Sequence, residues 1–165
     1  MPESFESAGT EDAEELPALH TDVAEHLTRM HGQGSWSMKT SAKGVSYALR
    51  TSSVFVAREA GRSVATLRLG TKKPWAIEVS YFTPCKRPLS LLSMAVAPAR
   101  QREGIGRRCL NEAWKAARAW PADAVRFDAY NAQAGAGGFF ARCGCKESGR
   151  VTYRNAPLIY FEVLL

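Results

Sequence analysis

The sequence predicts a mixed α/β domain in which short strands alternate with helices along the chain. Three observations support the prediction. Apolar residues recur at helical spacing in several segments, other short runs are alternating or continuously apolar, and glycines or prolines separate the two kinds. The chain has 165 residues, 45% of them hydrophobic, which suits one domain with a sizeable core. We therefore expect residues 1–165 to form a single domain.

The N-terminal part is predicted to hold a strand followed by two helices. Residues 4–8 form the expected strand, and Thr10 is the expected N-cap of a long helix that ends at Gly32 and Gly34. A shorter helix is expected over residues 39–50. These elements carry no recognisable site motif.

A hairpin and a long loop are predicted next. Segments 54–57 and 64–69 alternate as strands do, and residues 59–62 form the turn between them. The connection 71–88 contains three prolines and several aromatic residues. So long a loop is usually functional or mobile, and we expect it to face a ligand; the alternative is a loop that only covers the sheet.

The second half is predicted to hold four strands and two helices, each helix ended by a proline or a glycine. The strands are expected at 89–97, 125–130, 147–154 and 157–164, and the helices at 104–119 and 134–143.

Composition excludes several classes of protein. No stretch approaches the ~18 apolar residues that span a bilayer, and the first twenty residues lack the apolar region of a secretory signal. We therefore expect a cytoplasmic protein without a membrane partner. The spacing of the four cysteines matches no zinc framework. Cys143 and Cys145 could form a metal or redox pair, but buried reduced thiols are the better interpretation, so we expect no metal.

The net charge of +6 includes a compact basic cluster at residues 100–108. Such a cluster suits either nucleic acid or a phosphorylated small ligand. The chain has no recognisable nucleic-acid-binding module, and the cluster lies beside Gly104 and Gly106, which favours the small ligand.

Residues 94–110 run from an apolar strand through a loop with two glycines directly into a helix. The first helical turn leaves backbone N–H groups without partners, and these groups together with the helix dipole attract anions. A pyrophosphate is the natural occupant. The loop is neither a P-loop nor a dinucleotide-binding fingerprint, because it lacks Gly-Lys-Ser/Thr and a third glycine. A simple strand-to-helix turn is the alternative.

The segment Gln101-Arg102-Glu103-Gly104-Ile105-Gly106 resembles the Q/R-x-x-G-x-G/A signature of the GNAT N-acetyltransferase superfamily. Residues 128–147 resemble its second motif, in which a strand ends in Asn and a short helix carries aromatic residues before a glycine. The predicted order of elements also matches the family from about residue 5 to 165. The resemblance implies a GNAT fold. This fold has a central mixed, mostly antiparallel sheet of about seven strands, with about four helices, splayed between strands 4 and 5.

The resemblance further implies that acetyl-CoA is the co-substrate, held between strands 4 and 5. Backbone groups of the fourth strand would pair with the pantetheine arm, and loop amides would hold the pyrophosphate. Asn131 would contact the thioester end, with Phe139 and Phe140 packed beside the cofactor. The implied cofactor-binding residues are Met94, Ala95, Val96, Gln101, Arg102, Glu103, Gly104, Ile105, Gly106, Arg107, Asn131, Ala134 and Phe140.

The implied reaction is direct acetyl transfer to a primary amine in a ternary complex, which needs no enzyme nucleophile. Many relatives place a tyrosine acid where this chain has Phe140, and several place a carboxylate base in the fourth strand, where residues 89–97 have none. Asp128 and Tyr130 are the candidate catalytic residues, with Glu78 and Tyr153 as further substitutes; each of these residue types is more often structural or solvated. A catalytically silent acyl-CoA-binding module is therefore the alternative function.

The acceptor is expected to be a small-molecule or peptide amine, bound by the N-terminal helices and the 71–88 loop. The sequence leaves open its identity, the acyl-chain preference, and whether the protein forms a homodimer.

Overall fold

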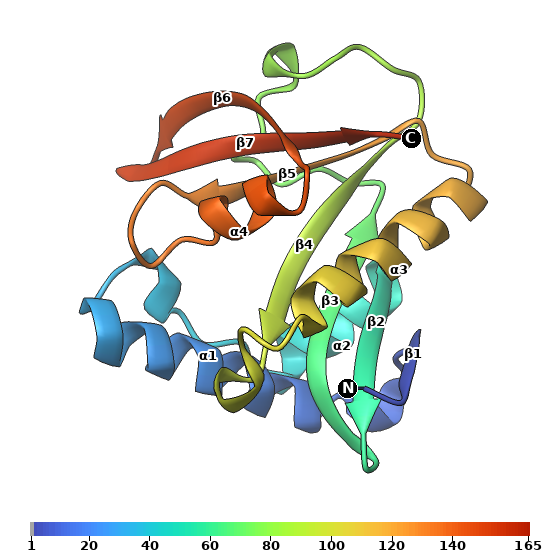
Figure 1. Ribbon diagram of the computed structural model, residues 1–165, viewed down its shortest axis with the longest axis vertical. Coiled ribbons are helices and arrows are strands. Elements are labelled where there is room, and N and C mark those ends of the chain that lie inside the picture. Colours follow the sequence, from blue (N-terminus) through green and yellow to red (C-terminus); the bar gives the residue numbers. More distant parts are fainter. Residues whose placement is uncertain (1) are drawn as a thin grey trace. The chain divides into compact units, whose positions relative to one another are not determined.

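The computed structural model describes residues 2–165, which contain seven strands and four α-helices (Figure 1). The elements follow one another as β1 (Ser4–Ser7), α1 (Glu15–His31), α2 (Ala42–Thr51), β2 (Ser53–Glu59), β3 (Arg62–Gly70), β4 (Pro88–Val96), α3 (Ile105–Ala119), β5 (Ala124–Tyr130), α4 (Gly137–Arg142), β6 (Lys146–Tyr153) and β7 (Ala156–Leu164).

The strands are hydrogen-bonded in the order β1-β2-β3-β4-β5-β7-β6. Strands β4 and β5 are parallel, whereas β1–β2, β2–β3, β5–β7 and β6–β7 are antiparallel. The register of β4 against β5 joins Pro88–Ser90 to Ala124–Arg126, so most of β4 continues beyond the paired segment. The predicted mixed, mostly antiparallel sheet, splayed between strands 4 and 5, is confirmed.

Two compact units make up the chain. Unit 1 comprises the residues up to Gly70 together with Leu92–Ala113, and unit 2 comprises Thr71–Leu91 with Trp114–Leu165. The division therefore falls inside β4 and inside α3. That residues 1–165 form a single domain stays a prediction.

The core of unit 1 joins α1 and α2 to the β2–β3 hairpin. Leu16 and Leu19 of α1 pack with Val45 of α2 and with Val54 and Val56 of β2. Burial of such aliphatic side chains contributes roughly 1.5–3 kcal/mol each. This packing holds α1 and α2 against the hairpin.

The predicted start of the first long helix was wrong. Residues Thr10–Asp12 form a separate 3-10 turn, and α1 begins at Glu15. The buried Asp12 carboxylate accepts a hydrogen bond from the Gly9 N–H at 2.8 Å and pairs with Arg58 of β2 at 2.8 Å. These two contacts hold the 3-10 turn against β2, so Thr10 does not cap the long helix.

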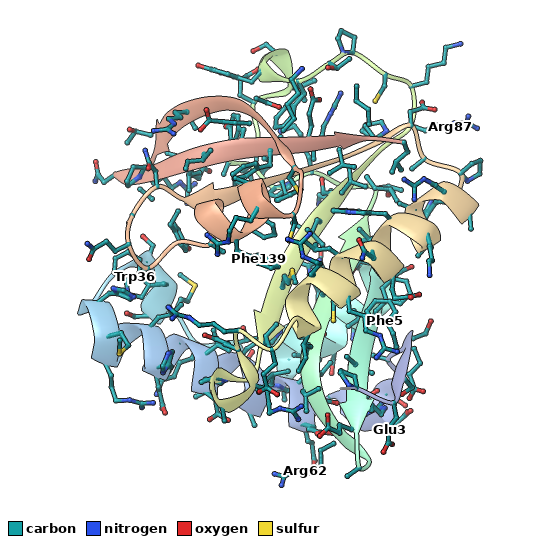
Figure 2. All side chains as sticks on the ribbon, in the orientation of Figure 1. Glu3, Phe5, Trp36, Arg62, Arg87 and Phe139 are labelled. Atoms are coloured by element: carbon teal, nitrogen blue, oxygen red, sulfur yellow. The ribbon has the colours of Figure 1, made fainter. Side chains whose placement is uncertain are left out.

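Unit 1 also contains the outer edge of the sheet, where β1 lies along β2 (Figure 1). Phe5, labelled in Figure 2, stacks on Phe55 with ring centroids 5.3 Å apart. The hairpin turns at Ala60 and Gly61, both with positive φ, within the predicted turn 59–62.

Unit 2 is built on β5, β7 and β6. The rings of Phe127, Phe140 and Phe161 pack on one another with centroids 4.7–5.7 Å apart. Helix α4 is shorter than the predicted helix over 134–143, because the chain makes a tight turn before it. A Cβ at Gly135 would lie 1.8 Å from the Tyr130 carbonyl oxygen, so only glycine fits that turn.

No helix in residues 2–165 is long and apolar enough to cross a bilayer.

Candidate anion-binding site and candidate catalytic residues

In unit 1, the chain leaves β4 through a 3-10 turn and enters α3 after two residues with left-handed backbone. Arg102 has φ 65° and Gly104 has φ 86°. Glycine adopts this conformation without steric cost, which explains its place directly before the helix. The first helical hydrogen bond runs from the Arg108 N–H to the Gly104 carbonyl at 3.1 Å, and buried Ile105 anchors the new helix.

The backbone amides of this loop are available to a ligand. Within residues 2–165, the N–H groups of Arg102, Glu103, Gly104, Ile105 and Gly106 have no hydrogen-bond acceptor. The loop residues Arg102–Gly104 are exposed. Unpaired amides at the N-terminus of a helix form a ready site for an anion. The geometry therefore suits the predicted pyrophosphate.

Arginines around this loop have different functions. Arg100 forms ion pairs with Glu59 at 2.8 Å and Glu103 at 3.1 Å, and these carboxylates raise its pKa. Arg108 donates to the Pro2 carbonyl at 2.7 Å. Arg100 and Arg108 therefore fasten the loop and helix to the rest of unit 1, while the exposed side chain of Arg102 makes no such bond in the described residues.

The end of β4 is tied to the same loop. The Gln101 side chain donates through Nε2 to the Val96 carbonyl at 3.1 Å, and the Ala97 N–H bonds to the Val64 carbonyl at 2.8 Å. Ser93, within β4, has φ 51°, a conformation uncommon for a residue other than glycine. Residues 94–96 follow this distortion and form the last part of β4, before the loop that leads into α3.

Unit 2 holds the other predicted cofactor-binding residues. Asn131 is exposed, and its N–H bonds to the Pro157 carbonyl at 2.8 Å. Ala134 is half-buried. Phe140 is 6% exposed and belongs to the aromatic core, whereas Phe139, labelled in Figure 2, is half-buried beside it. A function for these residues beside a cofactor stays a prediction.

Asp128 and Tyr130 lie two residues apart on β5 and so project from the same face of the strand. Burial raises the pKa of the Asp128 carboxyl. Burial, and secondarily the negative charge of Asp128, raise the pKa of the Tyr130 hydroxyl. A carboxylate with a raised pKa is a better base near neutral pH, and a protonated tyrosine can donate a proton. That Asp128 and Tyr130 act as a catalytic acid–base pair stays a prediction.

The sequence did not identify Tyr160, which faces Asp128 across the β5–β7 pair. Its hydroxyl accepts a hydrogen bond from the Glu78 N–H at 3.1 Å and donates to the Ala76 carbonyl. Tyr160 therefore binds the 71–88 loop. A tyrosine within the apolar run 158–161 was the signal for this contact, because a buried hydroxyl needs partners.

Further polar contacts hold the 71–88 loop in unit 2. The buried Glu162 carboxylate accepts from the Thr83 N–H at 3.1 Å and from the Thr83 hydroxyl at 2.8 Å. The buried Arg126 guanidinium donates to the Thr83 carbonyl at 2.8 Å. Ile77 and Phe82 pack with Tyr160. The loop covers the β5–β7 face; its predicted contact with an acceptor stays a prediction.

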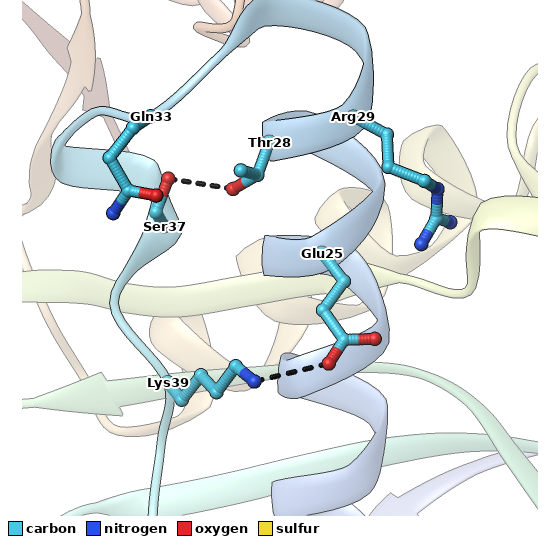
Figure 3. Close-up of a pocket in the computed structure, with 6 residues that line it drawn as sticks. All are labelled: Glu25, Thr28, Arg29, Gln33, Ser37 and Lys39. Carbon is cyan, nitrogen blue, oxygen red and sulfur yellow. Dashed lines mark hydrogen bonds and ion pairs between the residues drawn. The ribbon is translucent and has the colours of Figure 1, made fainter.

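Two pockets lie within unit 1. One is lined by polar residues of α1 and of the segment after it, where Lys39 pairs with Glu25 at 3.1 Å and the Thr28 and Ser37 hydroxyls lie 2.6 Å apart (Figure 3). The other has a volume of about 230 Å³. Its lining combines apolar residues of α1, α2, β2 and β3 with the polar residues His20, Thr40, Thr66, Arg68 and Ser93.

Of the four cysteines, Cys109 and Cys145 are buried, and Cys85 and Cys143 are half-buried. Residues 2–165 contain no group of three or more His, Cys, Asp or Glu side chains that could hold a metal ion. Burial raises the pKa of the Cys109 and Cys145 thiols to about 11. These two thiols are protonated at neutral pH, in agreement with the buried, reduced interpretation.

The family follows from comparison with known proteins. A family model described as an acetyltransferase (GNAT) domain matches residues 50–147, more than half of the chain. The chain therefore belongs to the GNAT acetyltransferase family. Comparison of the sequence with curated proteins finds no significant match.

Several solved structures share the fold. A ribosomal-protein-alanine N-acetyltransferase from Brucella melitensis aligns with a TM-score of 0.74 and 20% identity, covering 98% of this chain and 99% of that one. A GNAT family acetyltransferase from the same organism, in complex with acetyl-CoA, aligns with a TM-score of 0.64 and 18% identity, covering 98% and 87%. An acetyltransferase of the GNAT family from Streptococcus pneumoniae aligns at 0.73 and 14% identity, covering 98% of each. At these identities the likeness establishes the fold.

Proposed function

We propose that this protein is an N-acetyltransferase that moves the acetyl group of acetyl-CoA onto a primary amine. The main support is the exposed loop before α3, where the N–H groups of residues 102–106 have no acceptor in the described chain and Gly104 has φ 86°. Family membership and a relative in complex with acetyl-CoA support the same co-substrate.

In this proposal the loop amides bind the pyrophosphate of CoA. Five amide donors follow one another at residues 102–106, of which 102–104 are exposed, and hydrogen bonds to a charged group contribute about 1.5–3 kcal/mol each. Arg102 and Arg107 add positive charge beside them. The pantetheine arm pairs with backbone groups of Met94, Ala95 and Val96, as an added strand would. Ser93, which has φ 51°, directly precedes this segment of β4.

The acetyl group passes directly from CoA to the amine by addition and elimination, without an acetyl-enzyme intermediate. The neutral amine nitrogen attacks the thioester carbon and forms the new C–N bond; the tetrahedral intermediate then collapses, the C–S bond breaks, and CoA leaves as a thiolate. An alkyl amine has a pKa near ~10.4, so its deprotonation at pH 7 costs about 4–5 kcal/mol. A general base contributes about 10²–10⁴-fold to such a step.

We assign the proton transfers to Asp128 and Tyr130. The Asp128 carboxylate takes the proton that the amine loses, and the Tyr130 hydroxyl donates a proton to the thiolate. The pKa of Asp128, which burial raises, supports its function as the base. The Tyr130 hydroxyl is protonated at neutral pH and so has a proton to give, although burial raises its pKa and makes it a weaker acid. A thiolate with a pKa near ~8.5 is a tolerable leaving group, so the acid contributes less than the base.

The alternative function is a catalytically silent acyl-CoA-binding module of the same fold. Phe140 occupies the position where many relatives have an acidic tyrosine, and β4 contains no carboxylate. Phe140 cannot transfer a proton because its side chain has no ionisable group, and it belongs to the aromatic core.

Two measurements separate these functions. Calorimetric titration with acetyl-CoA tests binding, and CoA release with a panel of primary amines tests turnover. We expect both binding and turnover. Binding without turnover on any amine would favour the silent module, and no binding would refute both functions.

A further inference from the structure

The second pocket of unit 1 contains a positive charge that no carboxylate of residues 2–165 neutralises. The pocket lies among α1, α2 and the β2–β4 strands, with a volume of about 230 Å³. Leu16, Val45, Ala48 and Val54 supply apolar lining. Arg68 of β3 supplies the charge. This volume lies just below the range of about 300–1,000 Å³ that is usual for drug-sized ligands.

Arg68 differs from Arg58 and Arg100 of the same unit. Each of those two pairs with at least two carboxylates. Arg68 instead donates to the Ser93 hydroxyl and to the Ser52 hydroxyl, each at 3.3 Å, and forms no ion pair within residues 2–165. Two long bonds to neutral hydroxyls leave donors of the guanidinium unused, since it has five N–H groups.

The half-buried state of Arg68 makes this arrangement costly. Burial lowers the pKa of the Arg68 guanidinium, although an arginine stays charged at physiological pH. Burial, and secondarily the charge of Arg68, also lower the pKa of the nearby His20. The imidazole is therefore neutral at pH 7, and it neither adds charge nor compensates that of Arg68. An anion entering the pocket would meet one uncompensated cation in a partly desolvated site, where ion pairing is stronger than in water.

We propose that this pocket binds the acceptor through an anionic group, a carboxylate or a phosphate, which pairs with Arg68 while the apolar part of the acceptor packs on Leu16, Val45 and Val54. This inference rests on the proposed function. Ser93, which lines the pocket, directly precedes the segment assigned to pantetheine. The acceptor is therefore an amine that also carries an anion, such as an α-amino acid.

Matched amines test the charge requirement. Comparing kcat/KM for leucine with kcat/KM for leucinamide tests whether a carboxylate is required. The same comparison between O-phosphoethanolamine and ethanolamine tests whether a phosphate is required. In at least one pair we expect the anionic member to have the higher kcat/KM. Arg68→Gln should reduce that preference by about 10–100-fold, the loss expected for charge-assisted hydrogen bonds. Arg68→Lys should restore part of it, because the charge returns without the planar fork.

Arg62→Gln is the matched control, because Arg62 lies on the same strand, is exposed, and makes no ion pair in the described residues. This variant should keep the wild-type preference. Acetyl-CoA affinity, measured by calorimetry, should be equal in the Arg68 and Arg62 variants and in the wild type.

Nuclear magnetic resonance provides a readout without turnover. Leucine or O-phosphoethanolamine, added without acetyl-CoA, should shift the His20 ring resonances of the wild type, and Arg68→Gln should abolish the shift. His20→Asn assigns the resonances among the three histidines. If acetyl-CoA binds and neutral amines react as well as anionic ones in every variant, the inference is overturned and the proposed function stands. If acetyl-CoA does not bind, the proposed function fails, and the absence of any His20 shift would then overturn the pocket as well.

Discussion

Replacing Gly104 by valine should abolish tight binding of acetyl-CoA while leaving the fold intact. Gly104 has φ 86°, a backbone conformation that a β-branched residue rarely adopts. Valine therefore forces the turn before α3 to change, and the N–H groups of residues 102–106 no longer point to a common anion.

The size of the effect follows from the number of amides displaced. Losing two hydrogen bonds to a charged pyrophosphate, at about 1.5–3 kcal/mol each, weakens binding by about 3–6 kcal/mol. At 1.4 kcal/mol per tenfold change, the dissociation constant rises by roughly 10²–10⁴-fold. The left-handed conformation itself costs a non-glycine residue about 1–2 kcal/mol of stability.

Gly61→Val is the matched control. Gly61 has φ 74°, and a Cβ added there would have no atom within 4 Å. Both variants should therefore lose similar stability in thermal unfolding, but only Gly104→Val should lose affinity in calorimetric titration with acetyl-CoA. A folded Gly104→Val protein with the affinity of Gly61→Val would refute the assignment of the loop to the pyrophosphate.

Three further variants test other parts of the structure. Asp128→Asn should lower kcat/KM by about 10²–10⁴-fold. It should also remove the acidic limb of the pH profile of kcat/KM, because the wild-type base is active only above its raised pKa. An unchanged pH profile would exclude Asp128 as the base. Because the pKa of Asp128 is higher in the folded state than in the unfolded state, the folded state binds this proton more tightly. The free energy of unfolding of the wild type therefore falls as pH rises from the unfolded-state pKa of Asp128 through its folded-state pKa. Urea titrations of Asp128→Asn should lack this decrease. Gly135→Ala should lower the free energy of unfolding by about 2–4 kcal/mol, because its Cβ would meet the Tyr130 carbonyl; a stability equal to the wild type would contradict the tight turn. Phe140→Tyr should lower it by about 1–3 kcal/mol, because a hydroxyl enters an aromatic core; an undiminished melting temperature would mean that the hydroxyl reaches a polar partner or water.

Local patterns were sufficient to predict most elements. Alternation located β2 and β3, and a continuous apolar run located β4. The strand–loop–helix order around Gly104 also located the loop before α3; that this loop binds an anion stays a prediction. These features depend on residues close together in the sequence, so a local pattern contains enough information.

Contacts between distant residues caused the errors and omissions. The start of α1 was wrong because buried Asp12 pairs with Arg58, 46 residues away in sequence, and this pair holds a 3-10 turn ahead of the helix. Arg126 and Glu162 were not recognised as buried anchors of the 71–88 loop, since their charges usually indicate exposure.

The sequence by itself determined the order of helices and strands, the glycine-containing loop before α3, and the resemblance to the GNAT family. These depend on backbone preferences and periodicity, which act over a few residues. Only the tertiary structure placed Phe140 in an aromatic core, set Asp128 opposite Tyr160, and placed Arg68, which forms no ion pair within residues 2–165, in the wall of a pocket. Burial and charge pairing decide these features, and both depend on which distant segments the folded chain brings together.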